Sequence, residues 1–494
     1  MNGGTAEHQP DQPDGEATSG SSPPPAPPHD LPAAAPPSVR SGHIMQPNVP
    51  LVWGSSRELA RFWLLVAVTG IGAGIGAALL MEILHGVQHL AYGYHGGLFQ
   101  RGVQAAPPLR RVIVMAIAGV TAGLAWLTLR RFTHLSTGLS ESVWEEDGKL
   151  PFVFTIVNSV VQIVTVALGA TLGREGAPKE TGAAIASKVS DVGGLTAAQR
   201  RLLVACGAGA GMAAVYNVPL GGALFGLEVL LGTLTLPMVL PALATAGIAT
   251  GVSWVLLPDQ PTYRLPTYAV TPSLAIAAIV CGPLAGVLAV GYIRLFAWSK
   301  EHRPGGWRLL VSLAAVFVAV GCVSVEYPEV LGNGKDLAQF LFLGQLGLSL
   351  VAVLLVIRPL ATGTFLRGGA VGGLFTPTLA FGALFGAVFG HAWTALWPGT
   401  EPGAYAIIGA SAMLAAAMQA PLASLALMVE LTGTGGSLLV PLILAVIGAM
   451  LVSRALDDRS IYTAPLRHFG EPTVVRHPRD RGTPGPRDRD VTPG

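Results

Sequence analysis

Apolar segments of about 20 residues recur along most of this chain, and they constrain its fold more than any other feature. A helix that crosses a lipid bilayer needs about 20 apolar residues. Only 12% of the residues are charged, whereas a soluble domain carries about 25%. This composition excludes an ordinary soluble enzyme and predicts an all-α, multi-pass protein of the plasma membrane. The segments cover residues 59–84, 109–130, 152–172, 201–231, 236–257, 269–297, 307–325, 341–366, 370–397, 404–432 and 436–456.

Two polar tails flank the apolar body. Residues 1–50 contain 12 of the 38 prolines, and residues 471–494 contain 9 charged residues. Neither composition can bury a hydrophobic core, so both tails are predicted to be disordered. Residues 51–470 are predicted to form a single transmembrane domain. The net charge of +2 gives no reason to expect a nucleic-acid partner, and the three cysteines lack metal-ligand spacing.

The apolar body contains an internal repeat. Residues 207–228 align with residues 409–430 at an offset of 202, and eight of the 22 positions are identical. A second match has an offset of 200 and joins residues 169–183 to 369–383. Identical Ala and Leu are common in apolar sequence, but Pro and Glu are not. The repeat is supported by the matched pairs Pro219/Pro421, Glu228/Glu430, Gly169/Gly369, Gly173/Gly373 and Gly182/Gly382.

The repeat predicts two related halves, over about 59–257 and 269–456. Gly and Pro interrupt each half at corresponding places, namely residues 173–178, 207–211 with Pro219, 368–377 and Pro421. Non-helical backbone at membrane depth must be buried in protein or line a wet cavity. Duplicated halves with paired broken helices are typical of transport proteins, whose site lies near the bilayer midplane. We expect tilted, broken helices around such a site, with the halves in inverted orientation.

Three Gly-containing segments have the form of helix starts inside protein: residues 136–141, 173–178 and 372–377. The first turn of a helix presents unpaired N–H groups and a partial positive charge, which suits an anion. Gly lets an ion approach the backbone, and Pro in the first turn loses no needed N–H. The hydroxyl of Thr137 adds a donor. Each segment alone fits a capped kink, but three in repeated halves favour an anion pathway.

Glu175 stands in an apolar region beside Arg174. A carboxylate inside a membrane costs several kcal/mol unless it is paired or wet. Two interpretations remain open from the residues alone. Glu175 is either a helix-capping acid paired with Arg174, or a carboxylate that occupies the anion site and leaves it when protonated, acting as a gate and proton carrier.

These motifs resemble the ClC family of chloride channels and chloride/proton exchangers, over about residues 59–468. The sequence GREG is similar to the family's GREGP element, and GLFTP to its GxFxP element. Thr137 and Gly138 fall within a degraded form of its GSGIP element, and Tyr462 falls where the family has an anion-coordinating tyrosine. The two well-matched elements are formed by Gly173, Arg174, Glu175 and Gly176, and by Gly373, Leu374, Phe375, Thr376 and Pro377.

The resemblance implies a homodimer with one pore in each subunit. It implies that Glu175 is the gating and proton-accepting glutamate. It also implies that an anion is coordinated by the side chains of Thr137 and Tyr462 and by backbone N–H groups, those of Gly138, Leu374 and Phe375. Chloride is then the transported ligand, and no metal or other cofactor is expected.

Two positions depart from the family pattern. Val229 stands where the family's exchangers carry a second glutamate for protons, directly after the match to Glu228. Lys179 and Glu180 replace residues that are usually uncharged. Either they form a salt-bridged helix face, or the lysine raises the local potential for anions.

The sequence therefore predicts chloride transport that is channel-like or weakly coupled to protons. Stoichiometric chloride/proton exchange by another internal path, with an acid such as Glu141, is the alternative. An intramembrane enzyme is disfavoured, because the apolar body has no H-E-x-x-H metal motif and no G-x-S-x-G nucleophile motif.

Overall fold

The computed structural model describes residues 55–93, 97–132, 138–145, 147–399, 401–434 and 436–464. Within these ranges the regular elements are helices, and the one extended pairing is an isolated bridge between Gly173 and Gly373. The predicted all-α class is confirmed. The tails predicted over 1–50 and 471–494 lie outside the described residues, as does Thr137.

The helices of the first repeated half precede residue 254. Their bounds are α1 (Ser56–Tyr92), α2 (Phe99–Ala105), α3 (Pro108–Phe132), α4 (Leu139–Glu145), α5 (Phe152–Ala167), α6 (Gly176–Val192), α7 (Ala197–Tyr216), α8 (Pro219–Leu224), the π-helical turn η1 (Phe225–Leu231) and α9 (Leu236–Ser253).

The second half follows after a connection without helix. Its elements are α10 (Pro272–Glu301), α11 (Arg308–Glu326), the short 3₁₀ turn η2 (Pro328–Val330), α12 (Lys335–Phe342), α13 (Leu348–Gly368), α14 (Phe375–Leu396), α15 (Pro402–Met418), α16 (Pro421–Thr432) and α17 (Leu439–Leu456).

Eight of the described helices are long and apolar enough to cross a membrane. They also expose large apolar side chains: Leu64 is 63% exposed on α1 and Leu451 is 68% exposed on α17. Continuous apolar faces of this kind suit hydrocarbon rather than water. The multi-pass expectation is therefore confirmed. The eight helices are α1, α3, α9, α10, α11, α13, α14 and α17.

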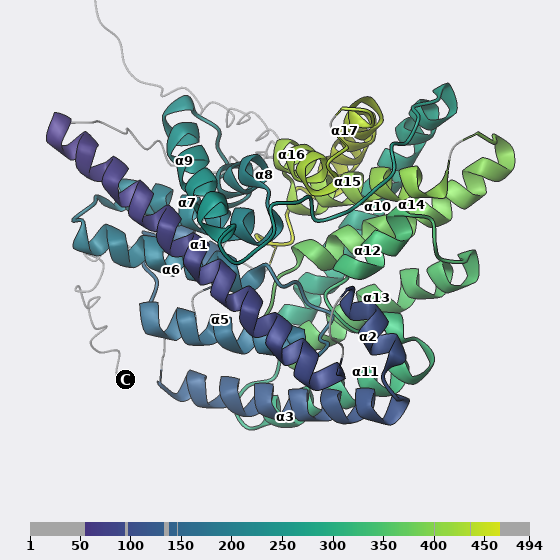
Figure 1. Cartoon of the computed structure of the whole chain (residues 1–494), viewed down its shortest axis with the longest axis horizontal. Helices are drawn as coiled ribbons and strands as arrows, with labels where there is room; N and C mark the ends of the chain where they lie inside the picture. Colours follow the sequence, from purple (N-terminus) through teal and green to yellow (C-terminus); the bar gives the residue numbers. More distant parts are fainter. Residues whose placement is uncertain are drawn as a thin grey trace, which may run out of the picture. The chain divides into compact units, whose positions relative to one another are not determined.

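Helices of the two halves make corresponding contacts. Helix α6 packs on α7 as α14 packs on α15, and α7 packs on α9 as α15 packs on α17. Helix α3 lies alongside its counterpart α11 (Figure 1). Helices α7 and α15 also end alike, because Asn217 and Gln419 both cap them with φ of 57°.

Two glutamates join the halves reciprocally. The Glu228 carboxylate accepts the N–H groups of Leu422 and Ala423 at the start of α16, at 3.3 and 2.6 Å. The Glu430 carboxylate accepts those of Leu220 and Gly221 at the start of α8, at 3.0 and 2.6 Å. Each acid therefore supplies acceptors for the free N–H groups that begin the other half's helix. This exchange describes a local two-fold relation between the halves.

One predicted helix break was wrong. Residues 207–211 lie inside the continuous, buried helix α7, and the break comes later, at Asn217 and Val218 before Pro219. The glycines serve close packing instead. A Cβ on Gly207 would overlap the backbone of Gly182 in α6, and one on Gly211 would overlap Pro178. Small residues that let backbones approach closely are typical of membrane helix interfaces.

Candidate functional site

The two halves meet at a pair of equivalent glycines. The N–H of Gly173 donates to the carbonyl of Gly373 at 2.6 Å, and the N–H of Gly373 donates back to Gly173 at 3.0 Å. Helices α6 and α14 begin two or three residues later, at Gly176 and Phe375. The bridge thus holds two helix N-termini together. Gly176 must be glycine here, because a Cβ would lie 2.6 Å from the Gly373 nitrogen.

The carboxylate of Glu175 lies on the N-terminus of α14. It accepts the N–H of Phe375 at 2.8 Å and the hydroxyl of Thr376 at 2.9 Å. A third donor is the hydroxyl of Tyr216, at 3.1 Å. The residue is completely buried. A helix N-terminus that can hold this carboxylate can hold a small anion by the same N–H group and partial charge.

This geometry distinguishes the two interpretations of Glu175. The residue is the N-cap of α6, yet its side chain makes no hydrogen bond to that helix. Among the described residues, no ion pair joins it to Arg174. The carboxylate therefore accepts donors at the start of α14 in the other half, and among the described residues it neither caps its own helix nor pairs with Arg174.

Two of the carboxylate's three partners were not among the predicted site residues. Tyr216 and Thr376 are both buried, and their hydroxyl oxygens lie 2.6 Å apart. Thr376 belongs to the GLFTP segment, and its hydroxyl group is the feature by which the sequence could have identified it as a site residue. Tyr216 is the last residue of α7, 41 positions after Glu175, and no local pattern links the two.

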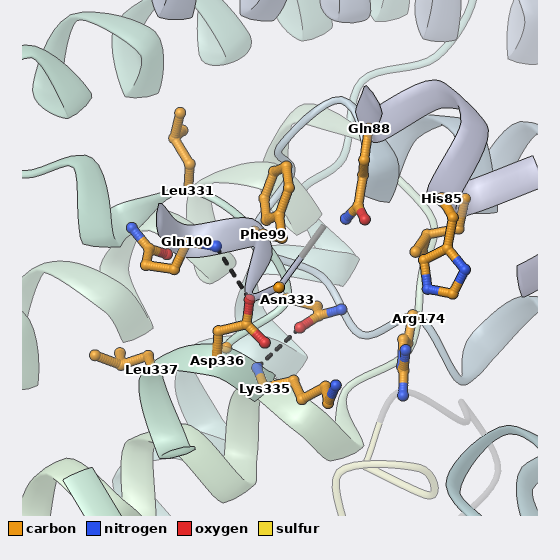
Figure 2. A pocket seen from close by; sticks show the side chains of 14 residues that line it. His85, Gln88, Phe99, Gln100, Arg174, Leu331, Asn333, Lys335, Asp336 and Leu337 are labelled. Carbon is orange, nitrogen blue, oxygen red and sulfur yellow. Dashed lines mark hydrogen bonds between the residues drawn. The ribbon is translucent and has the colours of Figure 1, made fainter. Parts of the chain in front are cut away.

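Arg174 is a lining residue of two cavities. Its guanidinium lies 4.9 Å from the centre of the Tyr216 ring, a favourable arrangement for a cation. The residue is 8% exposed, and its Nε has no hydrogen-bond partner among the residues that the structure describes. The smaller cavity, of about 60 Å³, is lined by Arg174 with His85 of α1 and Lys335 of α12 (Figure 2).

The larger cavity leads to the same tyrosine. It has a volume of about 600 Å³, and its lining includes Arg174, Arg264, Lys335 and Tyr216. No Asp or Glu is among its lining residues in the described part of the chain. A hollow lined by one sign of charge concentrates ions of the opposite sign. Tyr216 is thus both a lining residue of this cavity and a hydrogen-bond donor to Glu175.

Tyr462 lies in the segment after α17 and belongs to a different set of contacts. Its ring packs edge-on against Phe225 of η1, with centroids 5.8 Å apart. The Nζ of Lys179 lies 4.9 Å from the ring centre and 3.4 Å from the hydroxyl oxygen. No hydrogen bond within the described ranges joins Tyr462 to Glu175.

The remaining predicted residues take different positions. Gly138 is exposed, and its N–H donates to the carboxylate of Glu141 at 3.1 Å. Leu374 is the buried N-cap of α14, and Pro377 is the third residue of that helix. The structure thus brings Glu175, Phe375 and Gly373 together. Coordination of an anion by Gly138, Leu374 or Tyr462 stays a prediction, and Thr137 lies outside the described residues.

Comparison with known proteins gives consistent matches. Residues 121–454 match the protein family described as voltage gated chloride channel. The chain is 31% identical over 418 residues to the voltage-gated ClC-type chloride channel ClcB of Escherichia coli O17:K52:H18 (strain UMN026 / ExPEC). That match covers 81% of this chain and 98% of the relative. The ClcB protein of Escherichia coli strain SMS-3-5 / SECEC has the same identity and coverage.

Solved structures match the fold. A slow cyanobacterial Cl⁻/H⁺ antiporter has a TM-score of 0.71 at 22% identity, covering 82% of this chain and 96% of that one. A CLC-type fluoride/proton antiporter has a TM-score of 0.65 at 21% identity, covering 84% and 99%. At these identities the likeness concerns the fold alone.

Proposed function

The chain belongs to the voltage-gated chloride channel (ClC) family, and on that premise we propose that it moves chloride or a similar small anion across the membrane, with Glu175 as the gate. The observation that carries the proposal is the Glu175 carboxylate on the Phe375 N–H, 2.8 Å away. A negatively charged group of the protein occupies a place whose donors would equally bind an anion.

The gate works by competition for these donors. While Glu175 is ionised, its oxygens take the N–H of Phe375 and the hydroxyls of Tyr216 and Thr376. Protonation removes the charge that a helix N-terminus attracts, so the neutral side chain is held more weakly. An anion then takes its place. The cavity of about 600 Å³ that is lined by Arg174, Arg264 and Lys335 attracts anions and supplies them to the site.

We propose weak rather than obligatory coupling to protons. Val229, at the position of the family's second proton glutamate, is a buried side chain that cannot carry a proton. The relatives with solved structures include antiporters, so the alternative is stoichiometric exchange by another internal acid. Glu141 is one candidate, but its carboxylate caps Gly138 in the exposed turn before α4.

Glu180 is the better candidate for that alternative. It lies on α6, five residues after the gate, and accepts the amide groups of Asn158 and Gln162 at 2.8 and 2.7 Å. Trp126 donates to Asn158 at 3.0 Å. The Oε1 of Gln162 is buried and has no hydrogen-bond partner in the described part of the chain. Glu180 is the group in this cluster that can take up and release a proton, and Glu180→Gln would remove it.

The proposal is tested with purified protein in chloride-loaded liposomes. Chloride and pH are followed together while a potassium ionophore controls the voltage. We expect chloride efflux above that of protein-free liposomes, with little proton movement. Proton uptake in fixed ratio to chloride would support the exchanger, and its loss in Glu180→Gln would identify the acid. No anion flux at all would contradict the proposed function.

Glu175→Gln is the matching test of the gate. The amide carries no charge, so it imitates the protonated side chain at nearly the same size. We expect chloride flux that no longer increases with acidification. Glu82→Gln changes an exposed acid of α1 and is the control, with wild-type pH dependence expected. If the chloride flux of Glu175→Gln depends on pH as that of the wild type does, Glu175 has a structural role and is not the gate.

We also propose a homodimer in the plasma membrane, with one pore in each subunit and a transmembrane domain over residues 51–470. The family resemblance supports this assembly. The mass of the protein in detergent, and cross-linking in the bilayer, would test it. A monomer that transports anions in liposomes would contradict the dimer while leaving the pore proposal intact.

A further inference from the structure

The ends of α3, α10 and α13 meet the start of α11 at one place on the molecule. Helices α3 and α11 pack on each other, and α13 packs on both α10 and α11. A Cβ on Gly123 of α3 would touch Leu310 in the first turn of α11, and one on Gly369, which caps α13, would touch Leu309. Six basic residues stand at these helix ends and are called the basic cluster here: Arg130, Arg131, Lys300, Arg303, Arg308 and Arg367.

The basic cluster has few acids to balance its charge. None of its members forms an ion pair with an acid of the described residues, whereas Arg200 on α7 pairs with Asp191 at 3.0 Å. Two acids come near the cluster. Glu301 is exposed at the end of α10, and the charge of Glu141 acts on Lys300. The cluster therefore keeps a net positive charge.

Like charges within the cluster act on one another. The positive charge of Arg303 repels those of both Arg130 and Lys300. Arg130 and Lys300 are half-buried, so water screens this repulsion less than at an open surface. An anion bound between such cations would replace repulsion with attraction. The arrangement is thus suited to an anionic ligand.

Arg367 is held in place by its neighbours. Its guanidinium lies 5.7 Å from the centre of the Trp298 ring and donates to the carbonyl of His302. A guanidinium group has five N–H donors. Since this contact uses a neutral acceptor, the charge and further N–H groups remain available for an anion. A guanidinium fixed in this way can bind a phosphate group through two parallel hydrogen bonds.

Apolar and aromatic side chains show at which level of the membrane the cluster lies. Leu124 of α3 and Val311 of α11 are exposed within about two helical turns of the cluster. Trp298 and Trp307 are 52% and 69% exposed. Exposed tryptophan is typical of the boundary between membrane and water, where lipid headgroups lie. The basic cluster therefore lies beside headgroups, with surface for hydrocarbon next to it.

We propose that the basic cluster binds the phosphate headgroup of an anionic phospholipid, whose acyl chains lie on the exposed apolar faces of α3 and α11. Basic residues near the membrane surface attract anionic lipids, and basic pockets between membrane helices bind their headgroups. The inference goes beyond the proposed function, because the lipid binds whether or not the protein moves an anion.

Native mass spectrometry of the full-length protein in detergent tests the proposal. The protein is titrated with phosphatidylglycerol, which is anionic, and with phosphatidylcholine, which has no net charge. We expect the wild type to bind phosphatidylglycerol at least tenfold more tightly. Inorganic phosphate at the same concentration should displace little of it, because the acyl chains also contribute to binding. Equal affinity for the two lipids, or displacement by phosphate, would overturn the proposal.

Two pairs of substitutions locate the site. Arg303→Gln/Arg308→Gln should weaken the binding of phosphatidylglycerol about tenfold or more and leave that of phosphatidylcholine unchanged. Arg57→Gln/Arg61→Gln removes the same charge from two exposed arginines of α1 and should bind as the wild type does. Equal losses in both pairs would mean that net charge alone attracts the lipid and would overturn the proposal.

A third pair separates charge from folding. Arg303→Lys/Arg308→Lys keeps both charges and should retain most of the affinity for phosphatidylglycerol. A loss as large as in the glutamine pair would contradict a headgroup held by charge. The outcome for transport is independent: a protein that binds phosphatidylglycerol here but moves no anion would contradict the proposed function and leave this inference intact.

Discussion

Gly173 and Gly373, 200 residues apart, exchange both of their backbone hydrogen bonds. They occupy equivalent places in the two halves of the chain, so the contact relates each half to the other by a local two-fold axis. The helices that begin just after them present their N-termini side by side. A carboxylate from the first helix can therefore reach the N–H groups of the second, which is where the structure places Glu175.

Gly173→Ala should open the gate without disturbing the backbone. The three atoms nearest to a Cβ at this position all belong to the Glu175 carboxyl group. The methyl group therefore competes with the carboxylate and displaces a flexible side chain rather than the main chain. We expect anion flux in liposomes with little dependence on pH, as for Glu175→Gln.

Gly247→Ala is the control for this substitution, because a Cβ there has no atom of the described residues within 4 Å. It should behave as the wild type does. If acidification increases the flux of Gly173→Ala as much as it increases the flux of the wild type, gating does not require the Glu175 carboxylate to lie where the structure has it.

Tyr216→Phe and Thr376→Val should each weaken the binding of the Glu175 carboxylate at the start of α14. Each removes one hydroxyl donor from the ionised carboxylate, and a hydrogen bond to a charged group contributes about 1.5–3 kcal/mol. We expect higher chloride flux at neutral pH and a smaller increase on acidification. The measurement is chloride efflux from liposomes over a series of pH values.

Tyr405→Phe is a matched control for the tyrosine. Tyr405 is buried like Tyr216, but within the described ranges its hydroxyl has no hydrogen-bond partner. Its removal should leave flux unchanged. If Tyr216→Phe and Tyr405→Phe behave alike, the hydroxyl of Tyr216 does not hold the gate.

Glu228→Gln and Glu430→Gln should destabilise the protein by similar amounts. Each carboxylate accepts two N–H groups at the start of a helix in the other half. Loss of the charge should lower stability by about 1–2 kcal/mol in each case, which thermal melting in detergent would detect. An effect in only one variant would contradict the equivalence of the two contacts.

Asp457 should stabilise the segment that carries Tyr462 except at strongly acid pH. Its carboxylate accepts hydrogen bonds from Arg459 at 2.9 and 2.8 Å and from Arg294 of α10 at 3.3 Å. These bonds, chiefly those of Arg459, lower the pKa of Asp457 from 3.8 to about 2. A depressed pKa means that the stabilisation is complete above pH 3.8 and is lost as the pH falls through 2.

Melting temperature against pH is the measurement for Asp457. The wild type should melt higher than Asp457→Asn above pH 4, and the difference should shrink toward pH 2. Asp458→Asn changes the exposed neighbour and should match the wild type throughout. A difference between wild type and Asp457→Asn that persists unchanged at pH 2 would contradict this account.

Several features of the site could be predicted because they depend on local composition. Runs of apolar residues predict helices in a bilayer. Helix α6 begins three residues after Gly173, and α14 begins at Phe375, because the residues around them interrupt such runs. Glu175 could be singled out because an acid is costly in apolar surroundings. The breaks predicted over 207–211 were wrong, since glycine serves equally to end a helix and to let two helices touch.

By itself, the sequence determined the membrane environment, the helical class and the repeat, and it singled out Glu175 as the candidate gate. Only the tertiary structure decided which groups surround that carboxylate, because Tyr216 and Phe375 reach it from helices 41 and 200 residues away. The same holds for Lys179 and Tyr462, which are 283 residues apart. Periodicity and composition act over one or two helical turns, whereas an anion site is made of donors whose distances are set by how helices pack.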